Sequence, residues 1–242
     1  MLRALTAAFS FLTRIPMAAG SVEPRDLARS LTWFPAVGAA LGAALVAIGH
    51  LLLGPLSPGM TAVALVAVLA SLTGGLHLDG VADVFDALGG GRGQRDRMLA
   101  ILRDSRIGAH GAAGLVLLLV AKVVATAEIV ERATWALYAA PVAARWAVVP
   151  LVVAFPYARP EGLGKPFHGH AGPSQLIGAT LVAALAIGWL GTPALLPAFA
   201  ALAAALVLAV WLHRHLGGLT GDVYGAAIEL AELTFLVLAG LS

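Results

Sequence analysis

The feature that most constrains this chain is a series of apolar segments, each long enough to cross a lipid bilayer. A transmembrane helix needs about 20 mostly apolar residues, and such segments lie at 31–53, 60–78, 107–127, 134–155, 175–191, 193–213 and 222–241. Only 12% of the residues are charged, whereas soluble domains carry about 25%. We therefore predict an all-α fold, a polytopic integral membrane helical bundle with about seven transmembrane helices that forms a single domain over residues 1–242.

Small residues predict how these helices pack. Ala, Leu, Val and Gly dominate the apolar segments, and Gly38 and Gly42 have the spacing found where two membrane helices approach closely. A transmembrane β-barrel would instead need segments of about ten residues with alternating polarity, which this sequence lacks.

The first residues follow a different pattern. Their side chains fall on two faces of a helix, an apolar face made by Leu2, Leu5, Phe9 and Leu12 and a polar face made by Arg3, Ser10 and Arg14. This pattern is typical of an amphipathic helix that lies in the membrane interface, and Pro16 would end it. A cleaved signal peptide, with Ala18-Ala19-Gly20 as the cleavage site, is a weaker alternative.

The charges indicate an orientation and exclude several functions. If the N-terminus is cytoplasmic, 12 of the 15 basic residues fall in segments on the cytoplasmic side, as the positive-inside rule requires. Every polar motif would then face the cytoplasm. A formal charge of +2 is too small to suggest nucleic-acid binding, and the absence of cysteine excludes thiolate metal sites and cysteine nucleophiles.

The polar residues gather in the region 74–106. Within it, Asp79, Asp83 and Asp86 are spaced so that a helix would place them within a sector of about 60°. Carboxylates this close repel one another and need cations to neutralise them, and one or two Mg²⁺ ions bridging to a diphosphate would do so. Gly80 would leave room for the close approach of a ligand. The alternative is a solvated helix face, which would ordinarily mix acids with lysines.

Glycines and arginines follow the aspartates. The segment Gly89-Gly90-Gly91-Arg92-Gly93 either presents backbone N–H groups to an anion or forms a flexible turn. The segment Arg103-Asp104-Ser105-Arg106 combines two guanidinium groups, which pair with phosphate oxygens, with an acid that could bind a metal or accept a proton. Ordinary anchoring of the next span by positive charge is the alternative for this second segment.

A loop rich in proline and glycine lies at 156–173. It carries Arg159, Lys165, His168 and His170. We interpret it either as an ordered binding loop or as a solvated connector.

The last span contains three acidic residues. It opens with Asp222 and carries Glu229 and Glu232 at greater depth. Because carboxylates inside a membrane are energetically expensive, we expect both glutamates to face the interior of the bundle and to meet Arg145, Lys122 or a metal ion.

Taken together, the polar motifs resemble those of the cobalamin synthase family, the adenosylcobinamide-GDP ribazoletransferases. The resemblance is carried by the run His77-Leu-Asp-Gly-Val-Ala-Asp-Val-Phe-Asp-Ala-Leu-Gly-Gly-Gly and by Arg103-Asp-Ser-Arg-Ile-Gly-Ala-His-Gly. It extends to Phe11-Leu-Thr-Arg-Ile-Pro, Pro156-Tyr-Ala-Arg-Pro-Glu-Gly-Leu-Gly and Leu219-Thr-Gly-Asp-Val-Tyr-Gly-Ala, and so covers essentially the whole chain.

The resemblance implies a Mg²⁺-dependent enzyme in a bacterial or archaeal cytoplasmic membrane. It would join the cobinamide phosphate of adenosylcobinamide-GDP to the 5′ oxygen of α-ribazole, or of α-ribazole 5′-phosphate, and release GMP. Its partners would be these small molecules and the lipid bilayer, with a homo-oligomer left open.

The mechanistic hypothesis assigns roles to particular residues. Mg²⁺ would be held by Asp79, Asp83, Asp86 and Asp222, while Arg103 and Arg106 would take the charge on the phosphates. Asp86 or Asp104 would accept the proton of the ribazole hydroxyl. Further substrate contacts are predicted at His77, Gly80, Gly90, Arg92, Ser105, Arg159, Lys165 and Glu229.

Two other functions compete with this interpretation. A CDP-alcohol phosphotransferase also sets aspartates at a membrane surface, but its pattern opens with D-x-x-D-G-x-x-A-R, whereas Asp79-Gly80 comes first here and no Ala-Arg pair follows. A transporter would use Lys122, Arg145, Glu229 and Glu232 as an ion relay. A relay would leave the arginines of region 74–106 without a role.

Overall fold

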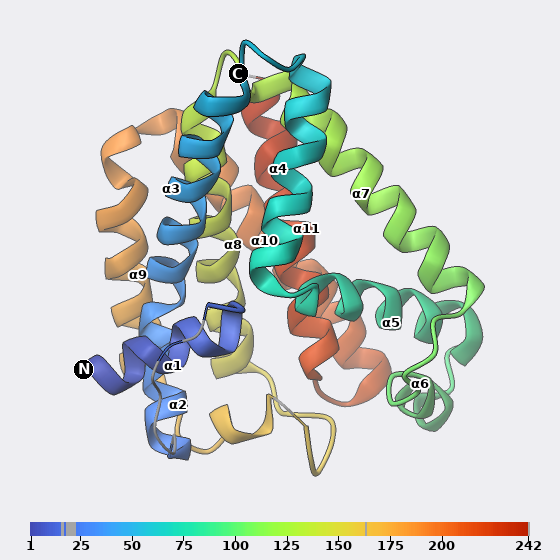
Figure 1. Ribbon diagram of the computed structural model, residues 1–242. Coiled ribbons are helices and arrows are strands. Elements are labelled where there is room, and N and C mark those ends of the chain that lie inside the picture. Colours follow the sequence, from blue (N-terminus) through green and yellow to red (C-terminus); the bar gives the residue numbers. More distant parts are fainter. Residues whose placement is uncertain (16, 18–22, 163, 242) are drawn as a thin grey trace.

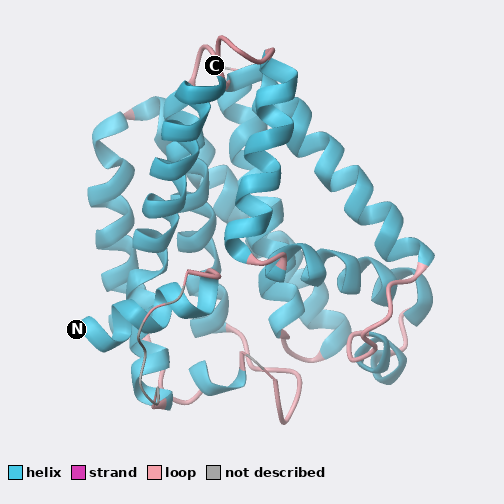
Figure 2. Cartoon of the chain, viewed as in Figure 1, coloured by secondary structure: helices cyan, strands magenta, loops and turns pink. Residues whose placement is uncertain are grey.

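The computed structural model describes residues 1–15, 17, 23–162 and 164–241, and its named elements are all helices (Figures 1 and 2). The long helices are α3 (Phe34–Leu52), α4 (Pro58–Thr73), α7 (Ala109–Ile129), α8 (Thr134–Ala154), α9 (Pro173–Ile187), α10 (Thr192–Leu216) and α11 (Gly221–Gly240). The other elements are α1 (Leu2–Leu12), α2 (Pro24–Ser30), α5 (Leu76–Gly91), α6 (Arg95–Ile101) and the 3₁₀ turns Leu31–Trp33, Lys165–Phe167 and Gly188–Leu190. Pro16 and Ala18-Ala19-Gly20 lie outside the described residues.

The predicted bundle of membrane helices is confirmed. In the described part of the chain, six helices are long and apolar enough to cross a membrane, and the pair α4 and α5 would make a seventh span if it counts as one. The most buried of the six is α8, which packs on α3, α9, α10 and α11. At Gly38 and Gly42 an added Cβ would lie 2.7 Å from backbone atoms of Val142 and Tyr138 on α8, so the predicted close approach through these glycines is also confirmed.

The prediction of a continuous span over 60–78 is wrong at its end. Helix α4 stops at Thr73, and α5 leaves at 93° to it. Gly74 and Gly75 between them both have left-handed backbones, with φ of 65° and 71°, which glycine adopts without a steric penalty. Because α5 runs nearly perpendicular to α4, the helix that carries the aspartates lies across the bundle and does not continue through it (Figure 1).

The polar segments gather at one end of the bundle. Helices α1, α2 and α6 and the loop between α8 and α9 lie at the lower end in Figure 1, whereas the C-terminus lies at the upper end. The predicted short N-terminal helix is confirmed, because α1 spans Leu2–Leu12. It packs through Ala4, Ala7, Ala8 and Leu12 and leaves Leu2, on the predicted apolar face, 74% exposed.

Candidate active site

A cavity of about 750 Å³ opens at this polar end, which is large enough for a small-molecule ligand. We call it the first cavity, and its lining has two contrasting parts. The charged part consists of Asp79, Arg103, Arg159, Glu161 and Asp222. The aromatic part consists of Phe11, Phe34, His77, Tyr157, Phe167 and Tyr224. A ligand that fills both parts would combine an anionic or metal-bound group with an apolar ring.

A second cavity of about 690 Å³ adjoins the first. The two share Phe11, Leu76 and Asp79 in their linings, and the second adds Arg14, Asp83, Ser105 and several apolar residues. The carboxylate-bearing face of α5 therefore borders both cavities. This arrangement suits a reaction between two ligands that meet at Asp79.

Two glycines bring α5 against the start of α11. A Cβ added at Gly80 would lie 2.5 Å from the carbonyl oxygen of Asp222, and one added at Gly225 would lie 3.2 Å from Cα of His77. The structure thus corrects the prediction that Gly80 leaves room for a ligand, because the backbone of α11 occupies that space. The same contact brings Asp222 beside the aspartates of α5.

The acidic cluster differs from the predicted one. Burial raises the pKa of Asp83 to about 7, and the negative charges of Asp222 and Asp79 add to the rise. Asp222 accepts hydrogen bonds from Arg159 Nη2 at 3.0 Å and from Thr220 Oγ1 at 3.1 Å. Among the described residues, no group of three or more His, Asp or Glu side chains is arranged to hold a metal ion alone. Further ligands would have to come from a bound substrate.

Asp86 has a structural role that the sequence did not indicate. Its two carboxylate oxygens accept hydrogen bonds from the backbone N–H groups of Gly108, at 2.6 Å, and Gly111, at 2.8 Å. Asp86 is buried and lines neither cavity. A carboxylate at a helix N-terminus is favoured by the unpaired amides and the helix dipole, so Asp86 caps α7. This capping role argues against the prediction that Asp86 binds Mg²⁺ or acts as the base, which stays a prediction.

The two arginines of the Arg103 to Arg106 segment do not act together. Arg103 lines the first cavity and Ser105 the second. Arg106 instead pairs with Asp104, with 2.7 Å between Nη2 and the carboxylate, and its side chain is 86% exposed. The hydrogen bonds from Arg106 lower the pKa of Asp104 to about 2. This pairing argues against Asp104 as a proton acceptor and against Arg106 as a phosphate ligand.

The glycine run belongs to a helix. Gly89, Gly90 and Gly91 form the last turn of α5, and a Cβ at Gly90 would lie 2.9 Å from Cδ1 of Ile101. The run is therefore neither an anion-binding loop nor a flexible turn, since close packing requires its small residues. Arg92 ends the helix with φ of 51°; it is exposed and lines neither cavity.

Described residues of the loop after α8 contribute to the first cavity. Arg159 and Phe167 both line that cavity, and Phe167 is buried. His168 Nε2 lies 3.0 Å from the Tyr224 hydroxyl. These contacts favour the binding loop over the solvated connector. The predicted contact Lys165 is exposed and lies outside both cavities.

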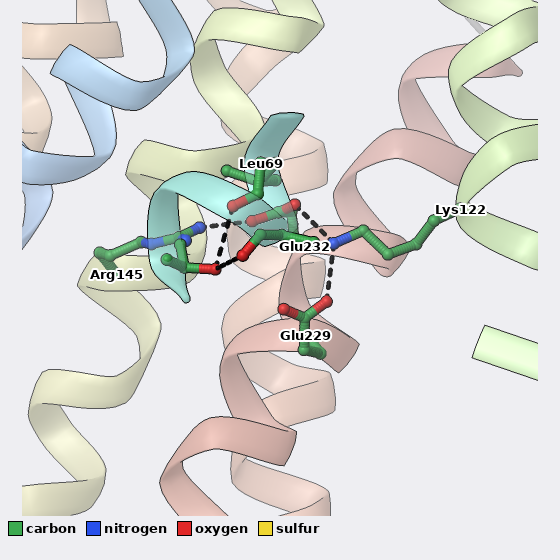
Figure 3. Close-up of polar contacts among 7 residues, drawn as sticks. Leu69, Lys122, Arg145, Glu229 and Glu232 are labelled. Carbon is green, nitrogen blue, oxygen red and sulfur yellow. Dashed lines mark hydrogen bonds and ion pairs between the residues drawn. The ribbon is translucent and has the colours of Figure 1, made fainter. Parts of the chain in front are cut away.

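An ion-pair network joins α7, α8 and α11 inside the bundle (Figure 3). Lys122 Nζ lies 2.6 Å from the Glu229 carboxylate and 2.8 Å from that of Glu232, which also pairs with Arg145. This confirms that both glutamates face the interior and meet these bases. Glu229 lines neither cavity, which argues against the prediction that it contacts substrate. The two basic and two acidic side chains are buried and form ion pairs with one another. This arrangement gives no support to the transporter interpretation.

His77, a predicted substrate contact, is among the residues that line the first cavity. It is 2% exposed, and neither ring nitrogen has a hydrogen-bond partner within the described structure. The phenylalanines that line the same cavity were not predicted as site residues. Phe11 opens one of the motifs that carry the family resemblance, whereas the sequence analysis singled out neither Phe34 nor Phe167.

Comparison with known proteins gives a consistent result. The family model for cobalamin-5-phosphate synthase matches residues 4–240. The adenosylcobinamide-GDP ribazoletransferase of Geotalea daltonii is 40% identical over 98% of this chain and 96% of its own length. Those of Ectopseudomonas mendocina and Klebsiella pneumoniae strain 342 are 41% and 42% identical, and each alignment covers at least 97% of both chains. No solved structure gives a significant match.

Proposed function

Because this chain belongs to the cobalamin-5-phosphate synthase family and is an adenosylcobinamide-GDP ribazoletransferase, we propose that the two cavities meeting at Asp79 hold its two substrates. A free ribose hydroxyl of α-ribazole, or of α-ribazole 5′-phosphate, forms a bond through its oxygen to the cobinamide phosphorus of adenosylcobinamide-GDP. The bond between that phosphorus and the bridging oxygen breaks, GMP leaves, and the hydroxyl proton is released. The observation that carries this proposal is the cluster of Asp79, Asp83 and Asp222 where the cavities adjoin.

The acidic cluster fits Mg²⁺ when a diphosphate is present. Asp79, Asp83 and Asp222 offer only oxygen ligands, and their mutual repulsion is what raises the pKa of Asp83 beyond the effect of burial. Mg²⁺ is commonly held by one or two carboxylates together with substrate phosphates, which agrees with the lack of a complete set of protein ligands. When bound, the ion neutralises charge on the diphosphate and polarises its phosphoryl oxygens.

Arginines complete the phosphate site. Arg103 and Arg159 both line the first cavity and flank the acidic cluster. Guanidinium groups pair bidentately with phosphate oxygens, so the two would bind the diphosphate and the departing GMP. Arg159 also orients Asp222 through their 3.0 Å hydrogen bond. Phosphoryl transfer depends mostly on such positioning and electrostatics.

The active face lies toward the cytoplasm. Support comes from the polar end of the bundle, which gathers α1, α2, α6 and the α8–α9 loop (Figure 1), and from the basic residues on those segments. Because the chain has no cysteine, Arg92→Cys provides a clean label site. An impermeant maleimide should modify it in inside-out vesicles, and labelling of right-side-out vesicles would reverse the assignment.

The central test is GMP release from adenosylcobinamide-GDP by purified protein in nanodiscs. We expect release to require both α-ribazole and Mg²⁺. Asp83→Asn should reduce the rate roughly 100-fold or more, because a carboxylate proposed to hold Mg²⁺ at the diphosphate is lost. Asp96→Asn, which changes a solvent-exposed aspartate on α6, is the matched control and should leave the rate unchanged.

Two outcomes would contradict the proposal in different ways. Full Mg²⁺-dependent turnover by Asp83→Asn would remove the metal assignment while leaving the reaction intact. Absence of GMP with wild-type protein, together with CMP release from a CDP-linked lipid precursor, would favour the CDP-alcohol phosphotransferase.

A further inference from the structure

The segment that follows α8 is fastened to the residues just before α11. Tyr157 and Leu219 form an isolated parallel bridge. The backbone N–H of Ala158 donates to the Leu219 carbonyl at 2.8 Å, and that of Leu219 donates to the Pro156 carbonyl at 2.8 Å. A Cβ added at Gly218 would lie 2.7 Å from the Pro156 carbonyl oxygen, so the two backbones are in contact. Tyr157 is thus held beside the first turn of α11.

The hydroxyl of Tyr157 lies among glycine backbones in the wall of the first cavity. Its oxygen accepts hydrogen bonds from the backbone N–H groups of Gly164 and Gly221. A Cβ added at Gly162 would clash with the same oxygen. Tyr157 and all three glycines line the first cavity. The backbone therefore fixes the position of this hydroxyl at the cavity surface.

The hydrogen of this hydroxyl is free to bind a ligand. A phenol has one hydrogen to donate and two lone pairs that accept, and the two backbone N–H groups occupy the lone pairs. Among the described residues, no acceptor is hydrogen-bonded to the hydrogen. The nearby carboxylate of Asp222 instead accepts hydrogen bonds from Arg159 and Thr220. Burial raises the pKa of Tyr157 above its ordinary value of 10, so the hydroxyl stays protonated near neutral pH.

The other tyrosine of the cavity is already paired. Tyr224 is buried, and its hydroxyl lies 3.0 Å from Nε2 of His168. The ring of His168 contacts both tyrosines, with centroid distances of 5.2 Å to Tyr157 and 6.3 Å to Tyr224. The Tyr224 hydroxyl therefore has a partner within the protein, whereas the hydrogen of Tyr157 is left for a ligand.

We propose that the Tyr157 hydroxyl donates a hydrogen bond to a phosphate oxygen of the GMP part of adenosylcobinamide-GDP, beside Arg159 in the first cavity. This inference rests on the proposed function and adds a substrate contact to it. Arg159 lines the same cavity, so a neutral donor and a guanidinium group would bind the same phosphate. A donor that the backbone already holds in place can stabilise the charge that builds up on GMP as its bond to the cobinamide phosphorus breaks.

The first test measures binding without turnover. Equilibrium dialysis of protein in nanodiscs with Mg²⁺ compares GMP with guanosine, which lacks the phosphate. Tyr157→Phe keeps the ring and removes the hydroxyl. It should bind GMP about tenfold more weakly, because one hydrogen bond to a charged acceptor is lost, and should bind guanosine as the wild type does. Tyr138→Phe, at a tyrosine on α8 that lines neither cavity, should leave both affinities unchanged.

A second test keeps the hydroxyl and so does not depend on the folding of Tyr157→Phe. A fluorine atom on the ring makes a tyrosine hydroxyl a stronger donor and a weaker acceptor. We expect protein with 3-fluorotyrosine in place of Tyr157 alone to bind GMP more tightly than the wild type, with the affinity for guanosine unchanged. The same exchange at Tyr138 is the control and should change neither affinity.

The outcomes separate this inference from the proposed function. If Tyr157→Phe binds GMP as tightly as the wild type does, the hydroxyl does not reach the phosphate. An equal loss of affinity for GMP and guanosine, or weaker GMP binding after fluorination, would mean that the hydroxyl only accepts hydrogen bonds and holds the loop. In each of these cases the wild-type protein still releases GMP from adenosylcobinamide-GDP, and only this inference fails. If the wild type releases no GMP, the proposed function itself fails.

Discussion

The carboxylate of Asp86 accepts a hydrogen bond from the backbone N–H of Gly108 at 2.6 Å, and this contact ties α5 to the start of α7. A second bond, from Gly111 at 2.8 Å, occupies the other carboxylate oxygen. The residue that stood third in the predicted aspartate cluster therefore positions the helix that carries the cluster. We therefore expect its side chain to act on architecture and not on substrate.

Asp86→Asn should destabilise the protein while leaving the affinity for Mg²⁺ unchanged. The amide presents an NH₂ group to a backbone donor, so one hydrogen bond to a charged acceptor is lost, at a cost of about 1.5–3 kcal/mol. Thermal unfolding and the Mg²⁺ dependence of GMP release measure the two effects. Asp96→Asn is the control. A normal melting temperature combined with a weakened response to Mg²⁺ would return Asp86 to the metal site.

Gly80→Ala should lower turnover about 100-fold. The added methyl group would lie 2.5 Å from the carbonyl oxygen of Asp222, so α5 must move away from α11, and a displacement of about 1 Å at a reacting centre has effects of this size. Gly59→Ala is the matched control, because a Cβ there has no neighbour within 4 Å. Equal turnover by the two variants would show that the crossing of α5 and α11 does not position the carboxylates.

Lys122→Met should destabilise the bundle by about 3–5 kcal/mol, since it leaves the buried Glu229 carboxylate without its cation. Lys122→Met combined with Glu229→Gln should recover much of this loss, because no unpaired charge remains. Denaturant unfolding in detergent gives both values. A double variant as unstable as the sum of the two single variants would mean that the pair is not coupled in the folded protein.

Asp104→Asn should leave the pH dependence of GMP release unchanged between pH 5 and 9. Arg106 lowers the pKa of Asp104 from the ordinary 3.8 to about 2. The ion pair is therefore complete above about pH 4 and is lost only as the pH falls toward 2, so nothing at this position titrates in the measured range. Loss of the acidic limb of the rate profile in Asp104→Asn would restore it as the base.

Hydropathy and charge predicted the structure correctly wherever the energetic cost depends on a single segment, such as exposing an apolar run to water or burying a carboxylate in a membrane. The spans were predicted because an apolar run has few alternatives to a membrane helix, and only the end of α4 was misplaced, at Gly74 and Gly75. Glu229 and Glu232 were predicted to meet Arg145, Lys122 or a metal ion because a carboxylate at that depth requires a cation, and the structure pairs them with the two bases. These conclusions need no knowledge of which helices are neighbours.

Assignments to the site were less reliable because they depend on neighbours. Asp79, Asp83 and Asp86 do lie on one helix, as their spacing predicted. Yet the start of α7 covers Asp86, whereas the start of α11 brings Asp222 beside Asp83. The phenylalanines at positions 11, 34 and 167 give no periodic signal, since each belongs to a different segment.

The amino-acid sequence by itself determined that this chain forms a membrane bundle, which family it resembles and which short region concentrates its acids and bases. Those properties follow from composition and from spacing along one helix. Only the tertiary structure decided which carboxylates share a site, which of them caps a helix, and which aromatic side chains from distant segments line one cavity. The reason is that close approach between helices, permitted here by Gly80 and Gly225, is set by packing across the whole bundle.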